Sequence, residues 1–215
     1  MYPVRYEADY VEEPRNRATT FFRLILAIPW LIVAQIYAIA AFVVAFIAWF
    51  ALLFTGRYPE GLYNFSAGFL RFAGRVNGWF FLQTDEWPSF GFADDRSYPI
   101  RVDVDPPLDA YNRWKTGFRL ILAFPVYVMA YLIPYLAQIG SVVAWLHIVF
   151  MGRTSGGIHN AITTGVAWQL RAGAYLLLVT ETIPPVSDQA PAASPKPRRT
   201  AAKKPAAKKP ATKKK

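Results

Sequence analysis

The chain has 215 residues, of which 54% are apolar and 16% aromatic, both high values for a soluble protein. Its net charge of +10 comes from the C-terminal stretch that begins at Lys196, which holds ten Lys or Arg residues and no acidic one. The absence of Cys excludes disulfides, thiol catalysis and thiolate metal sites, and the charged first residues predict that no cleavable signal peptide is present.

Every predicted element occurs twice, because the chain contains an internal repeat. The stretch Phe22–Pro29 returns as Phe118–Pro125, 96 positions later, and no gap is needed to align the flanking residues. A repeat at a fixed offset indicates a duplicated structural unit. We therefore expect one membrane module at 1–91, a second at 92–187, and a disordered tail rich in Lys, Ala and Pro at 188–215.

The first predicted element of each module is a β-strand. Apolar and aromatic residues alternate with charged ones along 2–10, and the alternation returns along 98–105. This period of two is typical of a half-buried strand. We expect the two strands to form a small sheet outside the bilayer that joins the halves. Asn16 and Asn112 follow the strands and would cap the next helices.

A long apolar run follows in each module. Leu24–Phe54 holds 31 residues without a charge. One straight helix of that length would measure about 46 Å, whereas the hydrocarbon core of a bilayer is about 30 Å thick. The run could form one long tilted helix or a hairpin of two short helices. Pro134 and Gly140 lie in the middle of the second run and favour a hairpin or re-entrant pair.

The last predicted element of each module is a second helix. Leu62–Leu82 is amphipathic, and its counterpart at Ile158–Leu178 contains a single charge, Arg171. The predicted fold class is therefore a mainly α integral membrane protein with a small extramembrane β element. We expect about two membrane-embedded segments per module plus an amphipathic helix, with roughly two to six crossings in total.

Arginines at the ends of the apolar runs are the first candidate site residues. Gly56–Arg57 and Gly152–Arg153 are typical of a helix C-cap followed by a side chain that reaches lipid headgroups. The alternative is a lipid-phosphate or anionic-substrate site built symmetrically by the two copies. The candidate headgroup or anion contacts are Arg23, Arg57, Arg119 and Arg153.

Polar residues inside the apolar segments form the second group of candidates. Charges within membrane segments are costly, so they either pair with other groups of the protein or line a polar path. The candidate intramembrane polar residues are Arg71, Arg75, Arg171 and Gln138.

No combination of residues in the sequence identifies a reaction. His147 and His159 are the only histidines, and the counterpart of His159 in the first copy is Tyr63, which argues against a duplicated metal site. The chain lacks a phosphate-binding glycine loop, a Gly-x-Ser-x-Gly motif and a zinc-protease His pair. We therefore expect no catalytic residue, no cofactor and no metal, and predict that the protein is not an enzyme.

The basic tail allows several interpretations. It could anchor the chain electrostatically on anionic lipid, bind nucleic acid by neutralising phosphates, or act as a solubilising extension. The positive-inside tendency places it in the cytoplasm. The residues expected to carry its electrostatic contacts are Lys203, Lys204, Lys208, Lys209, Lys213, Lys214 and Lys215.

Three motifs of the first copy carry a family resemblance: Phe22–Pro29, Phe54–Pro59 and Thr84–Pro88. With these motifs the chain resembles the DUF4389 family of bacterial membrane proteins, present as two tandem copies over about 1–187. The second copy departs from the pattern at several positions, among them Met151. The resemblance implies a membrane protein of unknown function, with no known catalytic residues to transfer.

The sequence favours a non-enzymatic integral membrane protein that serves as an accessory or scaffold subunit of a membrane assembly. Its expected partners are the lipid bilayer and a membrane protein or a second copy of the chain. The expected location is the cell membrane, multi-pass, with the tail cytoplasmic. One alternative is a small transporter or channel with duplicated halves. Another is a tether to nucleic acid or anionic lipid through the tail.

Overall fold

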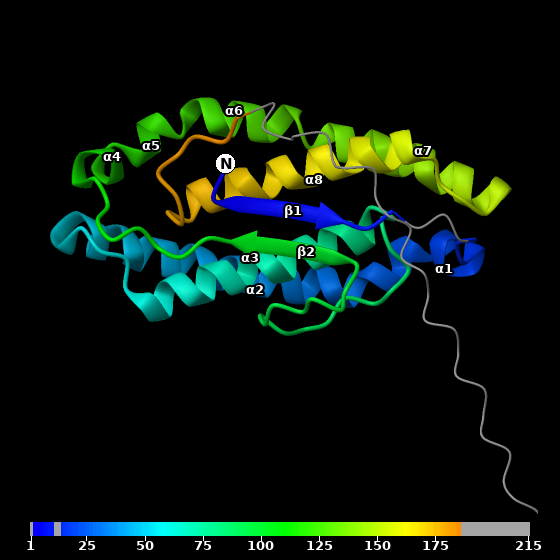
Figure 1. Cartoon of the computed structure of the whole chain (residues 1–215), viewed down its shortest axis with the longest axis horizontal. Coiled ribbons are helices and arrows are strands. Elements are labelled where there is room, and N and C mark those ends of the chain that lie inside the picture. The colour runs from blue at the N-terminus through cyan, green and yellow to red at the C-terminus, as the bar shows by residue number, and fades with distance from the viewer. Residues whose placement is uncertain (1, 11–13, 186–215) are drawn as a thin grey trace, which may run out of the picture.

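The computed structural model describes residues 2–10 and 14–185, and Figure 1 shows the arrangement of their elements. In chain order the elements are β1 (Val4–Ala8), α1 (Arg17–Phe21), α2 (Arg23–Thr55), α3 (Glu60–Phe80), β2 (Ile100–Val104), α4 (Arg113–Gly117), α5 (Arg119–Leu122), α6 (Phe124–Leu132), α7 (Tyr135–Met151) and α8 (Gly156–Leu176). The basic tail, with its candidate lysines, lies outside the described residues.

The two strands pair as predicted and show how the halves are related. β1 and β2 are antiparallel, with Val4 opposite Val104, Tyr6 opposite Val102 and Ala8 opposite Ile100. The repeat offset carries Val4 onto Ile100, so the pairing is symmetrical about the central Tyr6–Val102 pair. The two-fold axis of such a pair runs perpendicular to the sheet. The structure therefore confirms the small sheet that joins the halves and defines a pseudo-two-fold axis.

The predicted hairpins are wrong, because each apolar run continues as a single rod. α2 is one helix of 33 residues with Pro29 inside it, and α5, α6 and α7 follow one another from Arg119 to Met151. Pro134 interrupts the second rod without reversing it, since its backbone angles stay helical at φ −59° and ψ −20°. A proline removes one hydrogen bond, whereas a chain reversal needs a turn. The prediction of about two embedded segments per module therefore becomes one long rod per module.

The ends of the helices follow the sequence signals. The Asn16 side chain accepts hydrogen bonds from the Ala18 and Thr19 N–H groups, and Asn112 caps α4 in the same way. Gly56 and Gly152 end the long rods in the left-handed region, at φ +70° and +78°. A residue with a side chain is strained there, which explains why glycine stands at both positions.

The elements form three layers, and α3 shows their order. Gly74 of α3 lies under Val102 of β2, whereas Phe72 packs on Tyr37 of α2 with ring centroids 5.1 Å apart. At 3.6 residues per turn, positions 72 and 74 point to nearly opposite sides of the helix. α3 therefore separates the sheet from α2.

α8 takes the equivalent place in the second half. Its His159 and Arg171 side chains reach backbone carbonyls of β1, whereas Gly165 faces Ala137 of α7. The sheet thus forms the first layer, α3 and α8 the second, and the long rods the third. All elements run along the long axis of the molecule, and the two rods run in opposite directions (Figure 1).

The halves exchange their first helices. α1 packs on α7, and α4 packs on α2. The Arg15 N–H donates to the Gly152 carbonyl at 2.7 Å, and the Tyr111 N–H donates to the Gly56 carbonyl at 2.8 Å. These two bonds are equivalent under the repeat. The core is therefore shared between the halves.

Candidate membrane-facing surface and arginine sites

The outward side of α2 is the largest apolar feature of the first half. Small residues predominate on its inner stripe, where Ala27, Ala41, Ala45 and Ala48 are buried. Large side chains point outward: Leu24, Ile25, Ile28, Leu31, Ile32, Ile36, Ile39, Phe42, Val43, Phe46, Ile47, Phe50 and Phe54. A helix on the surface of a soluble protein has the opposite arrangement, with large apolar residues inside and polar ones outside. Small residues at helix contacts are typical of membrane proteins.

The rod α5–α7 repeats this arrangement. Ala123, Ala137, Gly140 and Ala144 are buried. The exposed large residues are Leu120, Ile121, Leu122, Phe124, Tyr127, Val128, Met129, Tyr131, Leu132, Tyr135, Leu136, Ile139, Val142, Val143, Leu146, Phe150 and Met151. Both rods are long and apolar enough to cross a membrane. We refer to the outward residues of α2 and α5–α7 together as the apolar face.

The outer side of the sheet has the opposite character. Arg5 pairs with Asp105 at 2.9 Å, and Arg101 pairs with Asp9 at 2.7 Å. These two ion pairs are equivalent under the repeat and lie on either side of the pseudo-two-fold axis. Their side chains keep a quarter to two fifths of their surface exposed. We refer to this side of the sheet as the charged face.

Arg23 does not lie at the surface, although the sequence suggested a headgroup contact. Its guanidinium donates to the Trp79 carbonyl at 3.1 Å and the Thr84 carbonyl at 3.2 Å, and pairs with Asp85 at 2.8 Å. Only 3% of Arg23 is exposed. The residue therefore ties the start of α2 to the end of α3.

Arg119 occupies the equivalent position in the second half. It donates to the carbonyls of Tyr175 and Thr180, and its guanidinium carbon lies 3.5 Å from the centre of the Tyr175 ring. Arg57 and Arg153, by contrast, are exposed after the ends of the long rods. Because Arg23 and Arg57 flank the same 33-residue helix, the structure does not bring them together.

The candidate intramembrane polar residues lie on three different helices, with Arg71 and Arg75 together on α3. Arg75 donates to the carbonyls of Ala93 and Gly91, and its equivalent Arg171 donates to the Val4 carbonyl at 3.4 Å. Arg71 is partly buried on α3, whereas Gln138 is exposed on α7. Arg75 and Arg171 therefore bind backbone groups of the protein, and a polar path lined by the four residues stays a prediction.

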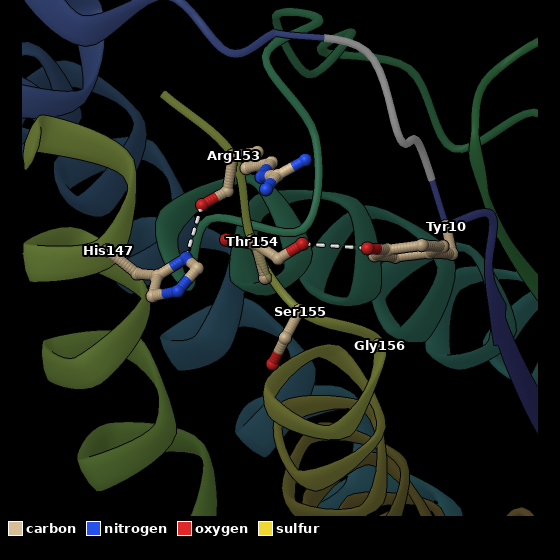
Figure 2. Close-up of a pocket in the computed structure, with 6 residues that line it drawn as sticks. All are labelled: Tyr10, His147, Arg153, Thr154, Ser155 and Gly156. Atoms are coloured by element: carbon tan, nitrogen blue, oxygen red, sulfur yellow. Dashed lines mark hydrogen bonds between the residues drawn. The ribbon is translucent and has the colours of Figure 1, made fainter. Parts of the chain in front are cut away.

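A pocket of about 520 Å³ lies where α7 ends and α8 begins. Figure 2 shows Tyr10 and His147 on either side of the Arg153–Thr154 segment. His147 Nδ1 lies 2.6 Å from the Arg153 carbonyl, and the Tyr10 hydroxyl donates to the Thr154 carbonyl at 2.7 Å. Ser155 also lines the pocket, and its side chain caps α8.

The chemistry of this pocket suits an anion. Arg153 lines the same pocket as Ser155 and Gly156 at the N-terminus of α8, where the positive end of the helix dipole favours negative charge. The equivalent position of the first half differs, because Pro59 lacks an N–H group and Glu60 places a carboxylate in the first turn of α3. The role of Arg153 as an anion or headgroup contact stays a prediction.

His159 is a structural residue of the interface between the halves. Its Nε2–H donates to the Ala8 carbonyl at 3.1 Å, and burial lowers its pKa below the ordinary value. Its counterpart, Tyr63, donates to the carbonyl of Asp105 in the other half. Within residues 2–10 and 14–185, no group of three or more His, Asp or Glu side chains could hold a metal ion.

Sequence reasoning missed a pair of tyrosines that connect the halves. The Tyr2 hydroxyl donates to the Arg171 and Thr182 carbonyls at 3.2 and 3.1 Å, and the Tyr98 hydroxyl donates to the Glu86 carbonyl at 2.8 Å. Both tyrosines are buried. The repeat could have indicated their role, because Tyr2 and Tyr98 occupy equivalent positions. A hydroxyl at the same position of both halves suggests that each one binds an equivalent partner.

These features define a class of protein: a duplicated helical module with pseudo-two-fold symmetry, an apolar face and an opposite charged face. The chain belongs to the family described as "Domain of unknown function (DUF4389)", which matches residues 17–92 and again 113–187. The two matches begin 96 positions apart, so the family match and the internal repeat agree. Comparison with curated proteins and with solved structures finds no match.

Proposed function

We propose that the protein is a non-enzymatic component of the cell membrane that acts as an accessory or scaffold subunit. The observation that carries this proposal is the arrangement of the long rods, in which small residues face the protein and large apolar residues face outward. Burying such a surface in lipid removes it from water at a gain of about 25 cal/mol per Å². An aqueous monomer rarely exposes so large an apolar surface.

The remaining polar groups support a scaffold. Arg23, Arg75 and Arg119 use their guanidinium groups to hold the chain together, so they act as internal connections. The charged face offers a polar surface of fixed geometry to a partner, and interfaces formed by charged groups gain specificity from such complementarity. The basic tail lies on the cytoplasmic side in this proposal. It would add attraction to anionic lipid of about 1 kcal/mol per basic residue near the surface.

Membrane embedding is tested by extraction. Membranes that contain the full chain are washed with alkaline carbonate and then solubilised in mild detergent. The protein should stay in the membrane pellet after the wash and enter solution only with detergent, because the apolar face holds it in lipid. Release by carbonate alone would contradict the embedding.

The scaffold role is tested on the detergent-solubilised material. Native electrophoresis and light scattering should give a particle larger than one chain plus its micelle, with a second copy or a different membrane protein as a constant component. A lone monomer that moves solute after reconstitution would contradict the scaffold and favour the transporter. A matched preparation that lacks 190–215 shows whether the tail contributes. Salt-sensitive DNA binding that disappears with the tail would instead support the tether.

A further inference from the structure

The apolar face and the charged face lie at opposite ends of the pseudo-two-fold axis. The axis passes through the Tyr6–Val102 pair, perpendicular to the sheet. It then passes between α3 and α8, where Gly74 contacts Leu170, the residue at the equivalent position. The long rods lie beyond these two helices. One direction along the axis therefore leads to ion pairs, and the other leads to exposed large apolar residues.

The direction of the rods restricts how the molecule can sit in a bilayer. The rods run in opposite directions along the long axis of the molecule, perpendicular to the pseudo-two-fold axis (Figure 1). If they crossed the bilayer, this axis would lie in the membrane plane and the sheet would lie at the depth of the bilayer centre. The ion pairs Arg5–Asp105 and Arg101–Asp9 would then face hydrocarbon with part of their surface exposed. Charged groups at that depth are strongly disfavoured.

The other orientation gives each face of the molecule the surroundings that its residues favour. When the pseudo-two-fold axis runs along the membrane normal, the apolar face enters lipid and the charged face points to water. The rods then lie parallel to the membrane surface. A helix with its side chains is about 10 Å thick, and one leaflet contributes about 15 Å of hydrocarbon, so a single layer of rods fits within one leaflet. Helices that lie in the interface with their apolar side in the acyl region are a known mode of membrane binding.

We propose that the chain is embedded in a single leaflet, with α2 and α5–α7 lying in the plane of the membrane and the charged face exposed to water. This inference rests on the proposed membrane embedding and replaces the expected multi-pass topology. It also explains the length of the rods, because a helix of 33 residues, about 50 Å long, exceeds a hydrocarbon core of about 30 Å but has no such limit in the membrane plane.

The orientation assigns a position to four exposed arginines near the ends of the rods. Arg57 and Arg153 follow the C-terminal ends of the rods, and Arg17 and Arg113 begin the short helices at the opposite rod ends. All four are exposed. Because the rod ends border the apolar face, the single-leaflet orientation places these arginines at the level of the phosphate groups, where arginine side chains bind well. If the tail is cytoplasmic, the occupied leaflet is the cytoplasmic one.

A pair of matched cysteines tests the orientation, because the chain has no native Cys. Gly61 and Gly157 are equivalent positions at the starts of α3 and α8, and a side chain at either would enter open space. The starts of α3 and α8 lie at opposite ends of the long axis (Figure 1). Gly61→Cys and Gly157→Cys are treated with a membrane-impermeant maleimide on sealed vesicles of each orientation. Both should react from the same side, whereas reaction from opposite sides would overturn the proposal.

Depth measurements along α2 provide a second, independent test. Ile25, Ile32, Ile39 and Phe46 are exposed at intervals of seven residues, so they lie on one side of the helix. Spin labels on single cysteines at these positions report depth through the ratio of collisions with oxygen and with a water-soluble nickel complex. The single-leaflet orientation predicts similar depths at all four. A crossing helix would change depth by about 10 Å per step and give a maximum in the middle, which would overturn the proposal.

Carbonate extraction of the same variants separates this inference from the proposed function. Protein that stays in the membrane and labels from opposite sides would overturn the orientation and leave the embedding intact. Protein released by carbonate would overturn both. Retention with labelling from one side supports both. A Phe42→Cys control, at an exposed position in the middle of α2, should resist the impermeant reagent in either orientation, which confirms that the reagent does not reach thiols in the hydrocarbon.

Discussion

Arg23 illustrates how little of a residue's role is visible in its neighbours along the chain. At the start of an apolar run, an arginine is typical of a headgroup contact, and the sequence suggested that role. In the folded chain its partners are the carbonyls of Trp79 and Thr84 and the carboxylate of Asp85. These partners stand some 60 positions away, and no local pattern indicates them. The repeat did offer one indication of these partners. Arg23 and Arg119 are equivalent positions, and so are Thr84 and Thr180, whose carbonyls they bind.

We expect Arg23→Gln to destabilise the protein. The substitution takes the charged donor away from two backbone carbonyls and from the Asp85 carboxylate, which keeps Arg15 at 3.6 Å as its remaining cation, in a region that is largely buried. Removing one partner of a buried ion pair costs about 3 kcal/mol, with a smaller loss where one partner is partly exposed, as Asp85 is. The free energy of unfolding in detergent, measured by denaturant titration, should fall accordingly.

Arg57→Gln is the matched control for this substitution. Arg57 is exposed at the other end of the same helix, so the same chemical change should alter the free energy of unfolding by no more than about 0.5 kcal/mol. Equal effects of the two substitutions would show that burial and bonding of Arg23 do not contribute to stability.

At the scale of the element, the sequence predicted most strands, caps and helix ends, and failed on the middle of the rods. Alternation of apolar and charged residues located both strands, and Asn16 and Gly56 marked true helix ends. Gly140 was interpreted as a break in the second apolar run. It lies inside α7 instead, where the missing side chain leaves room for Ile162 of α8. A glycine that opens a turn and a glycine that admits a neighbouring helix are alike in sequence. Only the packed structure distinguishes them.

The contact between α7 and α8 depends on small residues, and Gly165→Ala tests this. A Cβ at position 165 would lie 2.7 Å from the backbone nitrogen of Ala137 and 2.9 Å from its Cβ. Because backbone cannot move aside cheaply, we expect a loss of about 1–3 kcal/mol in the free energy of unfolding. Gly157→Ala is the control on the same helix. Its Cβ would meet open space, so stability should stay the same or rise by up to about 1 kcal/mol. Equal stability of the two variants would contradict close packing at 165.

At the scale of the whole molecule, the repeat predicted two halves but did not predict how far they interlock. An offset of 96 positions is compatible with two separate modules, and also with modules that exchange elements. The structure shows exchange: β1 packs on α8, α1 packs on α7, and α4 packs on α2. Contacts between distant segments depend on three-dimensional geometry, which a single sequence does not encode in its periodicity. For the same reason the sequence did not predict the two opposite faces. It placed the sheet outside the bilayer, but it did not indicate on which side of the long rods the sheet lies.

The interlocked core leads to a prediction about divided chains. We expect a fragment of residues 1–95 and a fragment of 96–215 to be unstable when each is produced alone, because each would expose the surface that the strand and first helix of the other half cover in the intact chain. Tyr2 and Tyr98 would lose their carbonyl partners, and the Arg15–Gly152 and Tyr111–Gly56 backbone bonds would be absent.

Produced together, the fragments should associate through these contacts and purify from detergent as one complex with the helical content of the intact chain. The cut after Asp95 falls in an exposed loop outside the helices and strands, so the break itself should cost little. Circular dichroism and thermal unfolding of the single and combined fragments provide the measurement. Two fragments that fold separately, with the same unfolding temperature alone and together, would show that the halves are independent modules and that the exchanged contacts do not hold the molecule together.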